Sequence, residues 1–219
     1  MRLLIAVLLA TGLLSPQIII IAKKKATGSP FDVGFNFRAN QSYEADDHST
    51  ACGNTTTATT CIVATTANYP ASTTVNGYTF NAGWEQAPGG MRDRSAANDT
   101  RLAGVAFINQ TIAADVDFRV TLPSAGTYTV HLAMGDATTA TTSTVQILDD
   151  TTVKLTIGPH ATTANQFYDA AATLLTNTTW PVSEVGVPIT FATTVFRLRL
   201  VKPGAAANIM VAHLRIHNP

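Results

Sequence analysis

The sequence predicts an all-β protein, a single β-sandwich of the jelly-roll type preceded by a short apolar N-terminal segment. Three observations support this fold class. Apolar and polar residues alternate in several runs, turn signals separate those runs, and no stretch after residue 25 has a convincing 3.6-residue apolar period. The chain is also rich in Thr, whose branched Cβ favours strands. An apolar content of 46 % excludes a disordered chain.

The predicted elements follow one another with short turns and two longer loops. We expect strands at 31–37 and 104–109, a hairpin around Asn76-Gly77, long polar or Gly-rich loops at 39–74 and 81–103, and a short helix as an option at 165–175.

The segment "FRVTLPSAGTYTVHLAMGD" at 118–136 contains two alternating runs joined by a turn. A simple hairpin across that turn would place the two apolar sets on opposite faces. Either a bulge restores the register, or the two strands lie in different sheets and face each other across the core. We favour the second interpretation.

Two further hairpins are predicted nearer the C-terminus. In the first, a three-residue turn at 149–151 places Ile147 opposite Val153 and Val145 opposite Leu155. In the second, the run "FRLRL" is matched against "MVAHL", so that Phe196, Leu198 and Leu200 face Leu214, Ala212 and Met210. This second hairpin would direct a basic ridge outward, made of Arg197, Arg199, His213, Arg215 and His217.

The N-terminal residues differ in character from the rest. Residues 1–25 form an apolar segment, residues 26–30 a linker, and residues 31–219 the sandwich domain. The segment is a signal, a membrane anchor or an assembly tail, and residues 3–22 are the only predicted membrane contact. Cys52 and Cys61 are two free thiols or one small disulfide, because their spacing fits no zinc signature.

The amino-acid composition limits the kinds of partner that the protein can bind. Only 13 % of the 219 residues are charged and the formal net charge is +0, so no field attracts nucleic acid. The composition is compatible with a homo-oligomer or with a larger assembly.

The residues "LPSAGTYTVHLAMGD", together with "FDVG", "NGYTFNAGW" and "LRLVKPGAAANIMVAHLRI", resemble malectin-like and galactose-binding-like domains in their order. The N-terminal segment is more weakly similar to uncharacterised virion-associated proteins. The first resemblance implies a jelly-roll sandwich that binds a glycan or polysaccharide without catalysis, outside the cell or on a virion surface.

The best candidate site is the loop that follows Trp84. An aromatic ring can stack on a sugar, and charged groups can bind its hydroxyls. The residues are Trp84, Arg92, Asp93, Arg94, Asp99 and Arg101, with Trp180 as a weaker candidate. The alternative is a loop held by its own Arg-Asp pairs, with Trp84 covering the core.

Two other groups of residues are weaker site candidates. Asp115, Asp117, Asp149 and Asp150 could hold a structural calcium ion, but no calcium-loop motif is present, so turn and strand-edge roles are favoured. Gly135-Asp136-Ala137 is similar to an esterase Gly-Asp-Ser block, but Ala137 stands at the nucleophile position. We interpret Asp136 as a turn residue at a strand end and expect no enzyme. The second function hypothesis is a structural component of a virion or surface assembly.

Overall fold

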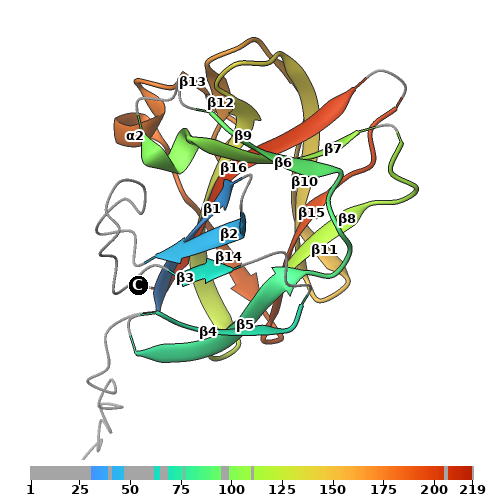
Figure 1. Cartoon of the computed structure of the whole chain (residues 1–219). Helices are drawn as coiled ribbons and strands as arrows, with labels where there is room; N and C mark the ends of the chain where they lie inside the picture. Colours follow the sequence, from blue (N-terminus) through green and yellow to red (C-terminus); the bar gives the residue numbers. More distant parts are fainter. Residues whose placement is uncertain are drawn as a thin grey trace, which may run out of the picture.

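The computed structural model describes residues 31–38, 41–46, 62–64, 69–75, 77–94, 99–109, 111–204 and 207–218. The predictions for residues 1–30 and for the two cysteines therefore lie outside the described residues. Within them the protein is an all-β sandwich of two antiparallel sheets, as predicted (Figure 1). The jelly-roll connectivity stays a prediction.

The strands form a large sheet and a small sheet. The large sheet contains β13 (Leu174–Thr176), β12 (Gln166–Tyr168), β9 (Gly126–Asp136), β16 (Asn208–His217), β1 (Asp32–Arg38), β2 (Gln41–Asp46) and β3 (Ile62–Ala64), with β14 (Val187–Phe191) beside β9, β7 (Gly104–Asn109) beside β16, and β6 (Gly90–Asp93) beside β7. The small sheet has the order β11 (Thr152–Thr162), β10 (Thr141–Asp149), β15 (Val195–Leu200), β8 (Val116–Thr121), β5 (Tyr78–Trp84) and β4 (Ala71–Val75).

The segment 118–136 crosses between the two sheets, which confirms the favoured interpretation. Strand β8 belongs to the small sheet and β9 to the large sheet. The predicted apolar sets are all buried and face each other across the core: Val116, Phe118, Val120 and Leu122 from one side, Tyr128, Val130 and Leu132 from the other. The Tyr128 hydroxyl donates a hydrogen bond of 2.8 Å to the Ser124 carbonyl, which fixes the turn between the sheets.

Aromatic rings fill the centre of the sandwich. Phe35 and Phe37 of β1 contact Phe118 of β8 with ring centroids 5.1 and 5.2 Å apart. These pairs are edge-to-face, the arrangement that the charge distribution of aromatic rings favours. The predicted first strand therefore supplies one wall of the main core.

The predicted Asn76-Gly77 hairpin is confirmed, because Val75 pairs with Tyr78 and Gly77 has the positive φ of +79° that such a turn needs. The predicted turn at 149–151 is wrong in length. Asp149 pairs with Thr152, so the turn has two central residues, and Asp150 has a φ of +53°. Val153 consequently lies opposite Leu148 and is 45 % exposed.

The hairpin predicted between 196–200 and 210–214 is also wrong. Strand β15 lies in the small sheet and β16 in the large sheet, so the two runs do not pair. A register shift in β16 between Val211 and His213 turns its apolar residues to different faces. The basic ridge is split between the sheets as a result, and His213 is fully buried beside Asn36.

The predicted long loops and the predicted short helix also differ from the structure. Region 39–74 contains β2, β3 and β4, and region 81–103 contains β6 and the 3₁₀ turn η1 (Thr100–Leu102). Region 165–175 forms β12 and β13 and not a helix. Its buried Asp169 carboxylate accepts backbone N–H bonds from Ala171, Thr173 and Val185, which competes with helical hydrogen bonding. The α-helix of the described chain is α2 (Trp180–Ser183).

Candidate functional site

The predicted aromatic platform at Trp84 does not exist, because the ring lies inside the sandwich. Trp84 ends β5 and is 2 % exposed. Its ring packs against Phe37 and Phe118, with centroid distances of 5.3 and 5.1 Å. The expectation of an exposed stacking face is therefore wrong, and the alternative of a Trp84 that covers the core is correct.

Trp180 is buried as well, at the start of α2. Its indole N–H donates a bond of 3.0 Å to the Leu132 carbonyl of β9. The Arg101 guanidinium lies 5.1 Å from the ring centroid and forms a salt bridge of 2.8 Å with Asp99. The structure thus brings together three predicted residues, but it uses them to attach the η1 turn to α2.

Arg94 contacts the Gly-Asp motif. Its guanidinium binds both carboxylate oxygens of Asp136, with N–O distances of 2.9 and 2.6 Å. Asp136 is 1 % exposed and also accepts a bond of 2.7 Å from the Thr138 amide. Asp136 is therefore a buried anchor that ties the chain after β6 to the end of β9. The predicted turn role at the strand end is confirmed by the Thr138 contact, but the sequence did not reveal the buried ion pair with Arg94.

The last two predicted residues, Arg92 and Asp93, belong to β6. Arg92 is exposed and its guanidinium lies 4.4 Å from the centroid of the Phe107 ring. The side chain of Asp93 lies outside the described part. The described residues of the predicted site therefore divide among the core, the η1 turn, the Asp136 anchor and the Phe107 edge.

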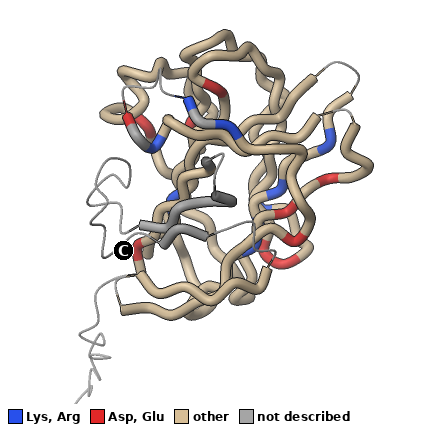
Figure 2. Tube along the Cα trace, viewed as in Figure 1, with Lys and Arg blue, Asp and Glu red and all other residues tan. Residues whose placement is uncertain are grey.

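The four aspartates considered for calcium take part in ion pairs and hydrogen bonds on the small sheet. Nε and Nη2 of Arg199 each donate a bond of 2.8 Å to the Asp117 carboxylate, and Asp150 contacts Arg197 at 2.5 Å. Figure 2 shows the acidic and basic positions of this side close together. Among the described residues, no three His, Cys, Asp or Glu side chains are grouped to hold a metal ion.

Two acids of this network have lowered pKa values. Burial by itself would raise the pKa of Glu85, but hydrogen bonds from Arg197 and Arg119 outweigh burial and lower it. Burial likewise opposes the lowered pKa of Asp149, whose carboxylate is stabilised by donors from Thr193 and Ala192. Hydrogen bonds to Glu85 raise the pKa of Arg197 in return. The lowered pKa values favour the ionised form of these carboxylates, although Nε of Arg119 is buried without a hydrogen-bond partner.

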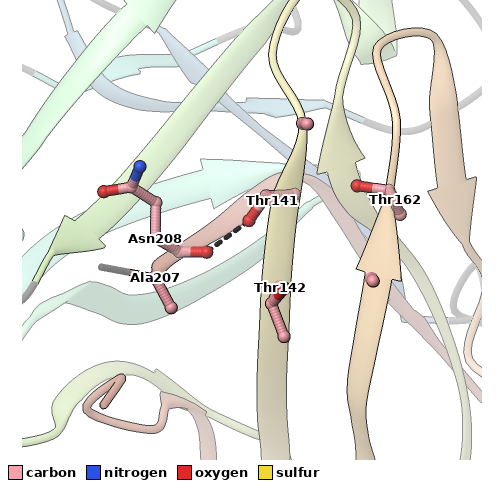
Figure 3. A pocket seen from close by; sticks show the side chains of 7 residues that line it. Thr141, Thr142, Thr162, Ala207 and Asn208 are labelled. Atoms are coloured by element: carbon pink, nitrogen blue, oxygen red, sulfur yellow. Dashed lines mark hydrogen bonds between the residues drawn. The ribbon is translucent and has the colours of Figure 1, made fainter. Parts of the chain in front are cut away.

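A pocket that the sequence did not indicate lies where β10, β11 and β16 approach one another at their ends. We call it the threonine pocket. Its volume is about 280 Å³, and it is lined by Ala140, Thr141, Thr142, Ala161, Thr162, Ala207 and Asn208 (Figure 3). No lining residue carries a charge, so the pocket offers hydroxyl and amide groups beside small apolar surfaces.

Hydrogen bonds fix one wall of the threonine pocket. The Thr141 hydroxyl bonds to the Asn208 backbone carbonyl and lies 3.0 Å from the Ser143 hydroxyl, which in turn accepts a bond from the Met210 amide. Figure 3 shows that the backbone carbonyl of Asn208, not its amide, faces Thr141. This wall is therefore held in place by contacts between the two sheets.

The opposite wall carries an unsatisfied group. The Thr162 hydroxyl oxygen is buried and has no hydrogen-bond partner within the protein. In Figure 3 it lies on the side of its strand that faces Thr141. Leaving a buried hydroxyl unbonded costs free energy. The oxygen has almost no accessible surface, so a ligand hydroxyl bonds to it only if the pocket wall shifts slightly.

Sequence reasoning missed the threonine pocket for a clear reason. Its residues come from three separate segments, and each segment is one of many Thr- and Ala-rich runs in the chain. Only strand pairing, with Thr141 opposite Thr162, brings them together.

Comparison with known proteins gives no assignment. No protein-family model matches the chain, and no curated protein matches it closely enough to count as a relative. Within the described residues, no helix has the length and apolar character needed to cross a membrane.

Proposed function

We propose that this protein is a non-catalytic β-sandwich module that binds the terminal sugar of a neutral glycan in the threonine pocket. The observation that carries the proposal is the unbonded, buried Thr162 hydroxyl in a pocket without charged lining residues. A sugar presents neutral hydroxyl groups that both donate and accept hydrogen bonds, and its C–H surface suits the alanine side chains. The likeness of the sequence to glycan-binding sandwich domains supports the same function.

Size and charge narrow the ligand class. The volume of about 280 Å³ is at the lower end for ligand sites, which suits one sugar ring and not a buried chain. An anionic sugar would find no cation among the lining residues. Such a module acts outside the cell or on a particle surface, where glycans are presented.

The test is a screen of neutral glycans with the full chain, followed by calorimetry of wild type and Thr162→Val. Valine has nearly the same shape as threonine but lacks the hydroxyl. Because the Thr162 hydroxyl bonds to no protein group, the variant should fold normally. Loss of one ligand hydrogen bond worth about 1.4 kcal/mol weakens binding about tenfold.

The matched control is Thr152→Val, an exposed threonine of the same strand outside the pocket, which should bind as wild type does. Full affinity in folded Thr162→Val would contradict the pocket assignment. A wild-type protein that binds none of the neutral glycans would contradict the glycan proposal itself.

A second candidate function is a structural part of a virion or surface assembly, and a separate observation favours it. Three large apolar side chains between residues 174 and 185 are exposed: Leu174 by 44 %, Val182 by 83 % and Val185 by 52 %. Strand β13, which carries Leu174, contacts α2, which carries Val182, so two of the three lie on neighbouring elements. Exposed apolar side chains of this kind are candidates for protein contacts. Light scattering of the full chain should then show an oligomer that Val182→Asp dissociates, and a monomeric wild type would exclude self-assembly through these residues.

A further inference from the structure

Two histidines of the large sheet direct the same ring nitrogen toward each other. His131 lies on β9 and His217 on the neighbouring strand β16. In the register His131 is opposite Arg215 and His217 is opposite Thr129, so the two histidines are diagonal neighbours on one face. Their Nε2 atoms are 3.1 Å apart, and their ring centroids 5.2 Å apart.

Glu184 fixes one of the two rings from behind. Its carboxylate oxygen lies 2.6 Å from Nδ1 of His131, and both side chains are largely buried, with exposures of 9 % and 13 %. A carboxylate can only accept a hydrogen bond when ionised, so Nδ1 of His131 carries the proton. In the neutral ring, Nε2 then has the free lone pair that points at His217.

This arrangement matches a known pattern of metal coordination. A histidine that binds a metal ion commonly donates its other ring N–H to a carboxylate, which orients the ring and strengthens it as a ligand. Two nitrogens bound to tetrahedral zinc at 2.0–2.1 Å are about 3.3 Å apart. The observed separation of 3.1 Å needs little adjustment to reach that value.

Charges of both signs lie around the pair. Arg215 pairs with both oxygens of Asp32 at 2.8 and 2.7 Å, and the Glu184 carboxylate lies against His131. A Cβ atom on Gly186 would lie 2.6 Å from Nε2 of His131 and 2.6 Å from Cγ2 of Thr129, so only glycine allows the backbone to pack this closely against the His131 ring.

We propose that His131 and His217 chelate a divalent transition-metal ion of the kind that prefers imidazole nitrogen, such as Zn²⁺, with Glu184 orienting His131 from the outer shell. The two Nε2 atoms supply two ligands, and water completes the coordination. Without a metal ion, a proton on one Nε2 bridges the gap to the other nitrogen. Metal binding needs the lone pairs of both Nε2 atoms, so this proton moves from Nε2 to Nδ1 of the neutral His217 ring.

The test is titration of the full, tag-free chain with ZnCl₂ in a calorimeter, with MgCl₂ as the hard-cation control. We expect one Zn²⁺ site per chain and no Mg²⁺ binding, because Mg²⁺ prefers oxygen ligands. His217→Asn and His131→Asn should each abolish the site. Glu184→Gln keeps both ligands, so it should weaken Zn²⁺ binding by roughly 10–100-fold.

The matched control is His160→Asn, because His160 is stacked on Tyr168 and does not belong to this cluster. It should bind Zn²⁺ as wild type does. The proposal is overturned if the wild type binds no Zn²⁺, if folded His217→Asn retains wild-type affinity, or if His160→Asn loses as much as His217→Asn. Should His217→Asn fail to fold, unchanged affinity in Glu184→Gln would overturn it equally.

Discussion

Replacing Arg94 by Met should destabilise the protein more than removing a more exposed arginine of the same region. The Asp136 carboxylate has a side-chain exposure of 0 %, whereas Arg94 is 13 % exposed. Arg94 donates to both oxygens of this carboxylate, and the Thr138 amide donates only to Oδ1. Arg94→Met therefore leaves Oδ2 of a buried charge without its cationic partner.

The expected loss follows from the geometry. Removing one partner of a buried ion pair costs about 3–5 kcal/mol. The two remaining bonds from Thr138 and the slight exposure of Arg94 place the expected value at the lower end, about 3 kcal/mol. Arg101→Met is the matched control, because Arg101 and Asp99 are 16 % and 18 % exposed. Asp99 keeps more contact with water than Asp136, so Arg101→Met should cost less, about 1–2 kcal/mol including the lost contact with the Trp180 ring.

Urea denaturation followed by circular dichroism measures both variants under the same conditions. Adding Asp136→Asn to each variant completes the comparison. Asp136→Asn should offset much of the Arg94→Met loss, because it removes the buried charge that lost its partner. Equal, small losses in Arg94→Met and Arg101→Met would refute the assignment of Asp136 as a buried anchor.

Three further predictions use matched pairs. Leu132 is fully buried, so Leu132→Ala should lower the free energy of unfolding in urea by about 2–5 kcal/mol. The control Leu174→Ala changes a side chain that is 44 % exposed and should lower it by under about 1 kcal/mol. Similar losses in the two variants would contradict the assignment of Leu132 to the core face of β9. Gly135→Ala should clearly lower the melting temperature, because φ of Gly135 is +148° and an added Cβ would clash with the Gln166 carbonyl oxygen. The control is Gly204→Ala, whose added Cβ would meet no atom within 4 Å, so this variant should melt as the wild type does. Asp149 has a lowered pKa in the folded state, so its contribution to stability is present above the unfolded pKa and is lost as pH falls through the folded one. Asp149→Asn should therefore flatten the acid side of the stability profile measured by denaturation at several pH values, and an unchanged profile would show that Asp149 does not contribute.

Local pattern determined the fold class and much of the core. Alternation along 116–122 and 128–132 identified residues that the structure buries without exception. Because side chains of a strand alternate between two faces, parity alone reveals which residues face a core. The same parity, combined with the turn at 123–126, left a bulge or two different sheets as alternatives and favoured the second, which the structure confirms.

Which strands pair with one another was harder to predict from the sequence. The run 196–200 is compatible with pairing to 210–214, yet each strand pairs elsewhere, because pairing depends on contacts far apart in the sequence. Trp84 shows the same difficulty for a single residue. A tryptophan next to a Gly-rich, charged loop suits a binding surface, and only the packing of Phe37 and Phe118 around it reveals a core residue.

The candidate sites depended wholly on tertiary structure. Thr141 and Thr162 meet through the pairing of β10 with β11, and Asn208 joins them from the other sheet. His131 and His217 are separated by 86 positions and meet only because β9 and β16 are neighbours. The sequence by itself determined that strands form and which of their faces are apolar, since both depend on adjacent residues. Which polar side chains share a surface was decided by long-range strand order, for which a single sequence carries no local signal.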